Sequence, residues 1–213
     1  MRRDCVFLVA DGNMAAAIQG FLDREQFHQS LGIAPFEFSR DLDLLVEPGH
    51  DPGVYLRAHE LLRPYERSHQ HAVILLDAAW DGSPGAERIS GDICGHMPGC
   101  GWATERFAVV VIDPELENWI WQDSPHVAAA VRHSETASLR DYLRGEGLWP
   151  EGASKPVRPK ETLEAVLRRA RRPRSSAVYR EITQKVTTRG CQDAAFRRLV
   201  EALQQWFPPE SQQ

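Results

Sequence analysis

Short apolar runs without alternation constrain the fold of this chain most. The run Val73–Leu76 is bounded by polar residues before it and by a Gly/Pro turn after it, and Cys5–Ala10 and Arg106–Ile112 have the same character. Strands that are buried on both faces have this pattern, whereas strands with one solvated face alternate. Helical spacing over 14–24 follows the run Cys5–Ala10. This order predicts an α/β protein in three layers, with a mostly parallel sheet and helices on both faces.

Weaker patterns complete the expected order. Partial alternation over 36–46 predicts another strand, and helical spacing predicts helices over 54–68, 85–94 and 115–121. A stretch with several Pro and Gly residues, 145–159, indicates a linker or a long loop. Three helical patterns follow it, over 160–171, 176–188 and 193–207. We therefore expect an α/β domain over residues 1–150 and a helical C-terminal extension over residues 151–213.

Charge, cysteine content and hydropathy exclude several classes of protein. The formal net charge of −5 argues against a protein that coats nucleic acid generally, although it leaves room for a local basic patch. The 4 cysteines are irregularly spaced, which argues against a disulfide framework. No apolar run approaches the length of a membrane helix. We expect a soluble, cytoplasmic protein with reduced thiols and no membrane partner.

Acidic residues follow three of the predicted strands. Asp11 follows the first, Asp77 and Asp81 follow the Val73–Leu76 run, and Glu115 and Glu117 follow the last. Parallel strands would bring these carboxylates to one edge of the sheet, where mutual repulsion calls for a cation. Hard divalent ions prefer oxygen ligands, and such an ion can activate water or stabilise a phosphoryl oxygen. A local interpretation stays open, because each acid also suits a turn or a helix start.

Three segments carry a family resemblance. They are Leu8-Val-Ala-Asp-Gly12, Leu75-Leu-Asp-Ala-Ala-Trp-Asp-Gly82 and Ile112-Asp-Pro-Glu-Leu-Glu-Asn-Trp119. On these motifs the chain resembles the TOPRIM-like proteins, a group that topoisomerases, primases and overcoming-lysogenization-defect nucleases share. It is most similar to TOPRIM-like families of bacterial defence islands, such as the small TOPRIM-like component of methylation-associated phage-defence systems. The C-terminal helices, with Lys155, Lys160, Tyr179 and Phe196, resemble the tail of those families.

The resemblance implies phosphodiester chemistry that depends on Mg²⁺, or on Mn²⁺ in its place. The catalytic residues that it implies are Asp11, Asp77, Glu115 and Glu117, and the metal ligands that it implies are Asp11, Asp77 and Asp81.

Departures from the family motifs leave two functions open. The first motif of the family has Glu where this chain has Asp11, and often a second Glu where it has Ala15. The second motif is usually Asp-x-Asp, whereas here Ala79 follows Asp77 at that spacing. The chain is expected to be either a metal-dependent nuclease of anti-phage defence or a non-catalytic subunit. The second would have a degraded metal site and would bind partner defence proteins.

Cysteine and histidine occur together in the segment from Cys94 to Cys100, with His96 between them. These three side chains are possible zinc ligands, but a structural zinc site normally has four. Free thiols and a loop histidine are the alternative interpretation.

One dense basic run stands out near the C-terminal helices. Its arginines are Arg168, Arg169, Arg171, Arg172 and Arg174. Such a run is expected to bind a nucleic acid or an acidic partner protein. A solvated helix end, where arginines suit the helix dipole, is the other interpretation.

Overall fold

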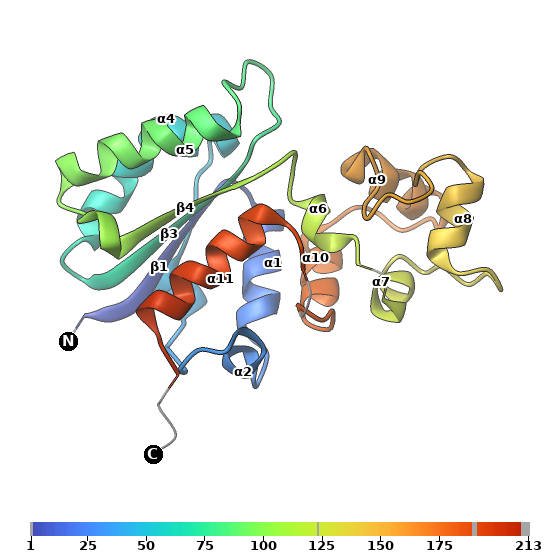
Figure 1. The fold of residues 1–213 in the computed structure, drawn as a ribbon, viewed down its shortest axis with the longest axis horizontal. Helices are drawn as coiled ribbons and strands as arrows, with labels where there is room; N and C mark the ends of the chain where they lie inside the picture. The colour runs from blue at the N-terminus through green and yellow to red at the C-terminus, as the bar shows by residue number, and fades with distance from the viewer. Residues whose placement is uncertain (1, 123, 189–190, 210–213) are drawn as a thin grey trace.

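Four parallel strands form a single sheet in the order β2-β1-β3-β4. The computed structural model describes residues 2–122, 124–188 and 191–209 (Figure 1). The predicted parallel sheet is confirmed, and the apolar runs near 5–10, 73–77 and 107–112 are adjacent strands within it. The strands are β1 (Arg3–Val9), β2 (Leu44–Val46), β3 (His69–Asp77) and β4 (Phe107–Ile112).

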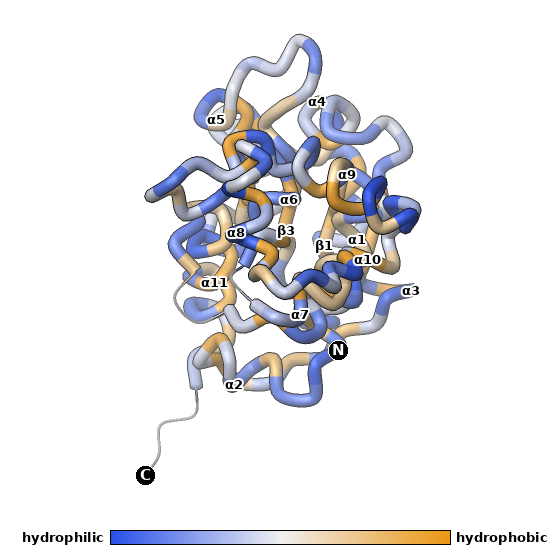
Figure 2. The backbone as a smooth tube through the Cα atoms, turned by 90° about the vertical axis from the view of Figure 1, so that its right-hand side faces the viewer, coloured by the Kyte–Doolittle hydropathy of each residue, from blue (hydrophilic) through white to orange (hydrophobic). Residues whose placement is uncertain are grey.

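Helices cover both faces of the sheet, as the apolar strands require. Figure 1 shows α4 (His50–Leu62) and α5 (Ala86–His96) on one side, with α1 (Gly12–Leu22) and α11 (Ala194–Trp206) on the other. The tube in Figure 2 is apolar along β1 and β3 in the interior. The three-layer α/β prediction is therefore confirmed. None of the helices in the described part of the chain has the length and hydrophobicity that crossing a bilayer requires.

The strand expected over 36–46 is wrong in its extent. Only β2 is a strand, and the helix α3 (Arg40–Asp43) precedes it. The aromatic residues that produced the alternation pack without sheet hydrogen bonds. Phe36 stacks on Phe207 at 4.6 Å between ring centroids, and Phe38 meets Phe7 edge-on at 5.8 Å. Phe36 is buried and Phe38 packs against the core, which explains why the apolar pattern continued beyond the strand.

Helices beyond residue 150 divide between two places. Figure 1 shows α9 (Pro159–Arg169) beside α7 (Pro125–Ala130) and α8 (Leu139–Gly145), to one side of the sheet, and α6 (Glu117–Ile120) leads to them from β4. By contrast, α10 (Ser176–Thr183) packs on α1, and α11 packs on β4. Buried side chains of α10 and α11 belong to the same hydrophobic cluster as the strands. The shorter elements are α2 (Phe27–Leu31) and the 3₁₀ turns Arg63–Tyr65, Met97–Cys100 and Thr104–Arg106.

Helix α10 packs unusually close to α1. A Cβ atom on Gly20 would lie 2.4 Å from Thr183 Oγ1 and 2.6 Å from the Arg180 carbonyl oxygen. Only glycine leaves room for this approach. The guanidinium of Arg24 then donates to the carbonyl of Val186 at 2.6 Å. These contacts fix the depth at which α10 lies against the sheet domain.

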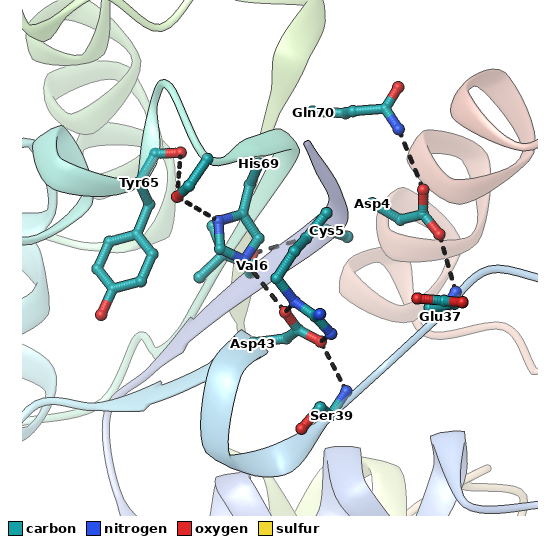
Figure 3. A network of polar contacts seen from close by, with 11 residues as sticks. Asp4, Cys5, Val6, Glu37, Ser39, Asp43, Tyr65, His69 and Gln70 are labelled. Carbon is teal, nitrogen blue, oxygen red and sulfur yellow. Dashed lines mark hydrogen bonds and ion pairs between the residues drawn. The ribbon is translucent and has the colours of Figure 1, made fainter. Parts of the chain in front are cut away.

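A buried aspartate closes the amino edge of the sheet. The side chain of Asp43 is fully buried and accepts hydrogen bonds from Arg3 Nη2 at 2.6 Å and from the Ser39 N–H at 2.6 Å. Its other oxygen lies 3.1 Å from His69 Nε2, and Figure 3 shows the carboxylate between the His69 ring and Ser39. Burial alone would raise the pKa of Asp43, but Arg3, Ser39 and His69 hold it below its usual value. This network connects α3 to β1 and β3.

Replacing Asp43 by Asn is expected to destabilise the protein by about 2 kcal/mol at neutral pH, because the partly exposed Arg3 guanidinium loses the charged partner of its hydrogen bonds. The contribution is present above the unfolded-state pKa, about pH 4, and is lost as the pH falls through the depressed folded pKa. Denaturant unfolding at several pH values measures both effects. Asp41→Asn, an exposed position of the same helix, is the matched control. Equal effects of the two substitutions would contradict the assignment.

Candidate functional site

The connections between the strands create a switch point at the carboxyl edge of the sheet. From β1 the chain moves outward to β2, and it then returns to place β3 on the opposite side of β1. In open α/β sheets, ligands bind outside the carboxyl ends of the strands at such a point. Asp11 follows β1, and Asp77 is the last residue of β3. Both acids therefore lie where the topology favours a site.

Asp77 is the central residue of this edge. Its Oδ1 atom is buried and has no hydrogen-bond partner among the residues that the structure describes. Burial raises the pKa of Asp77 well above its usual value, and the charges of Asp51, Glu117, Asp11 and Glu115 raise it further. The carboxylates predicted from the sequence thus act on one another electrostatically.

Most of the other carboxylates are engaged by donors of the protein itself. Asp11 caps α1 and accepts hydrogen bonds from two main-chain N–H groups at 2.8 and 2.9 Å. Asp51 accepts the N–H of Asp77 at 2.7 Å, and Glu115 accepts the N–H of Lys160 at 2.9 Å. Burial is the main cause that raises the pKa values of Asp51 and Glu115. These acids therefore stabilise the backbone around the edge.

Glu117 has an internal cation as its partner. Its side chain is 2% exposed, and Arg174 Nη2 donates to its Oε1 atom at 2.7 Å. The Tyr179 hydroxyl also donates to Oε1, and Arg174 Nε lies 2.6 Å from that hydroxyl oxygen. Burial raises the pKa of Tyr179, and the neighbouring Glu117 raises it further. The three side chains form one hydrogen-bonded group between α6 and the segment before α10.

The predicted metal ligands do not surround one point. Among the described residues, no three His, Cys, Asp or Glu side chains are placed to hold one metal ion. Asp81 is exposed in the turn after β3. The edge, with its carboxylates in their present positions, does not fit a resident Mg²⁺ or Mn²⁺ ion.

The possible zinc ligands are also apart. Cys94, His96 and Cys100 do not form a metal-binding group within the described residues. The Cys100 thiol lies 3.0 Å from the Met97 carbonyl oxygen, to which it donates, and the His96 ring packs near the ring of His59. The free-thiol interpretation accounts for these contacts.

The arginines of the basic run lie at two different places on the molecule. Arg168, Arg172 and Arg174 line one depression together with Asn13 of α1. Arg169 instead donates to the Tyr142 hydroxyl at 2.8 Å and pairs with Glu135, beside α8. The fifth residue, Arg171, is exposed. The five arginines therefore do not share one surface.

Comparisons with known proteins identify no relative of this chain. No protein-family model, curated protein or solved structure matches the chain. The acidic edge is therefore interpreted from its own geometry.

Sequence reasoning missed two features of this edge. Asp51 follows the end of β2 as Asp11 follows β1, and the same rule of acids after strands could have found it. The contact between Glu117 and Arg174 joins residues 57 positions apart. No pattern in the sequence indicates that pairing, because it depends on how α10 packs on α1.

We expect Arg174→Met to destabilise the protein by about 3 kcal/mol, because Glu117 would remain buried without its cation. Arg168→Met, which removes an exposed arginine of the same run, is the control and should have little effect. Denaturant unfolding measures both. Adding Glu117→Gln to Arg174→Met should recover part of the loss, as a double-mutant cycle would show. No recovery would mean that the two side chains are not coupled.

Asp77→Asn is expected to be more stable than the wild type, and this difference in stability should grow as the pH rises. A raised folded-state pKa means that the stability associated with protonated Asp77 is present at low pH and is lost as the pH rises toward that pKa. The amide cannot ionise, so the variant does not incur this loss. Melting temperatures from about pH 5 to about pH 8 test the prediction. A difference between variant and wild type that does not change with pH would contradict it.

Proposed function

We propose that the chain is a TOPRIM-like component of a bacterial anti-phage defence system that acts as a non-catalytic subunit and binds partner defence proteins. The observation that carries the proposal is the engagement of the acidic edge. Glu117 is bound to Arg174 and Tyr179, while Asp11, Asp51 and Glu115 accept main-chain N–H groups. These bonds hold the carboxylates in positions from which no three of the described acids converge on one ion, as a catalytic Mg²⁺ site requires.

The fold and the motifs support a TOPRIM-like identity without a working metal site. The acids of the three motif segments lie at the carboxyl edge of a parallel sheet, in line with the resemblance. The departures at Asp11 and Ala15 remove the longer Glu side chains that the family motif has there. A shorter acid that already caps α1 has little reach toward an ion. The chemistry of this edge therefore suits structure and recognition better than phosphodiester cleavage.

A Mg²⁺- or Mn²⁺-dependent nuclease is the second candidate, and one observation favours it. Asp77 keeps a buried, unpaired oxygen among several carboxylates, which is a costly arrangement for a structural residue. A bound ion would supply charge neutralisation at a phosphoryl oxygen. This chain would have to free Glu117 from Arg174, or move Asp11 and Asp51 toward Asp77, before it could hold the ion.

Thermal unfolding with and without millimolar Mg²⁺ or Mn²⁺ distinguishes the two candidates. A ligand that binds the folded state raises the melting temperature. We expect no metal-dependent increase for the wild type, for Asp77→Ala or for Asp81→Ala, the exposed control. An increase in the wild type that Asp77→Ala abolishes and Asp81→Ala keeps would contradict the non-catalytic proposal.

The role in defence is tested by phage plaque assays on the complete system. Asp77→Asn and Glu115→Gln should both keep protection, because neither carboxylate takes part in catalysis under the proposal. Loss of protection by folded, normally expressed variants would instead support the nuclease.

A further inference from the structure

Two histidines face each other across neighbouring helices. Helices α4 and α5 lie side by side on one face of the sheet (Figure 1). The ring of His59, on α4, lies 5.2 Å between centroids from the ring of His96, at the end of α5, and the ring planes are tilted by 41°. Both helices lead back from the carboxyl edge of the sheet toward its amino edge. The histidine pair, near their ends, therefore lies away from the acidic edge.

The packing of the two helices holds this pair in register. One turn earlier along each helix, the Tyr55 hydroxyl donates to Asp92 Oδ2 at 2.5 Å. Tyr55 and His59 are four residues apart on α4, and Asp92 and His96 are four residues apart on α5, so each set shares one helix face. The hydrogen bond opposes sliding and rotation of one helix against the other. The two imidazoles are therefore brought together by the fold itself.

The separation of the rings matches that of two imidazoles on one metal ion. A tetrahedral zinc ion binds histidine nitrogens at about 2.0 Å, which places two such ring centroids about 5 Å apart. His96 is exposed and His59 is half-buried, so water has access to the pair. Within the described ranges, neither ring forms a hydrogen bond or an ion pair that would occupy its nitrogens. Both side chains can therefore offer a nitrogen to the same ion.

Imidazole as the ligand selects the class of ion. Histidine nitrogens suit zinc, nickel and copper, whereas Mg²⁺ and Ca²⁺ take oxygen ligands. Neither Cys94 nor Cys100 completes a group of three ligands with His96 in the described part of the chain. We propose that His59 and His96 bind one divalent transition-metal ion, such as Zn²⁺ or Ni²⁺, with water in its other positions. The ion bridges α4 and α5, and the site is independent of the proposed function.

Isothermal titration calorimetry with Ni²⁺, Zn²⁺ and Mg²⁺ tests the site. The wild type should bind Ni²⁺ and Zn²⁺ but not Mg²⁺. His59→Gln and His96→Gln should each raise the Kd for Ni²⁺ at least about tenfold, because a single imidazole remains as ligand. His126→Gln removes an exposed histidine of α7 and is the matched control. It should bind both ions as the wild type does.

Two further measurements separate a bridging ion from a general loss of stability. Ni²⁺ should raise the melting temperature of the wild type and of His126→Gln, but of neither His59→Gln nor His96→Gln. Each variant is compared with itself without the ion, so a change in its own stability does not enter the result. Electron paramagnetic resonance of bound Cu²⁺ should show two coordinating imidazole nitrogens in the wild type and one in either variant of the pair.

Several results would overturn the inference. One is the absence of Ni²⁺ and Zn²⁺ binding by the wild type at up to about 1 mM ion. Another is a loss of binding in only one variant of the pair, because a bridge needs both rings. An equal loss in His126→Gln would indicate unspecific binding to surface histidines. Mg²⁺ binds oxygen ligands, so the effect of Mg²⁺ on melting reports on the acidic edge and remains a separate result.

Discussion

The contact between Glu117 and Arg174 determines how this protein tolerates its acidic edge. Four carboxylates act on the pKa of Asp77, and Glu117 is among them with a side chain that is 2% exposed. A buried carboxylate without a cation is unfavourable by several kcal/mol. Arg174 provides the counter-charge from a segment 57 positions away in the sequence. The protein thus supplies from its own chain a positive charge that a metal ion could otherwise provide.

The position of that arginine depends on helix packing. Gly20 lets α10 approach α1 so closely that any side chain at this position would collide with Thr183 and the backbone at Arg180. At that depth, the Tyr179 hydroxyl reaches Glu117, and Arg174 contacts both that hydroxyl and the Glu117 carboxylate. The C-terminal helices therefore complete the candidate site that the strands begin. Folding and the electrostatics of the edge are coupled through one close helix contact.

The parts of this structure that were predictable are those with local causes. Apolar runs such as Val73–Leu76 indicate strands buried on both faces, and their parallel order places Asp11 and Asp77 at one edge. The extent of β2 was not predictable, because Phe36 packs on Phe207 from the far end of the chain. Arg174 was not predictable as the partner of Glu117 either, because it also lies far away in the sequence. Tertiary contacts decide both, and periodicity contains no information on them.

Two aspartates at opposite ends of the sheet, Asp43 buried and Asp77 partly buried, show what distinguishes structure from a candidate site. Asp43 accepts bonds from Arg3, Ser39 and His69, and these partners lower its pKa despite burial. Asp77 keeps an unpaired oxygen among like charges, and its pKa rises. The first arrangement stabilises the fold, whereas the second lowers its stability whenever Asp77 ionises. Unfavourable polar groups of the second kind persist where they serve a function, so the carboxyl edge is the part of this molecule where function is to be sought.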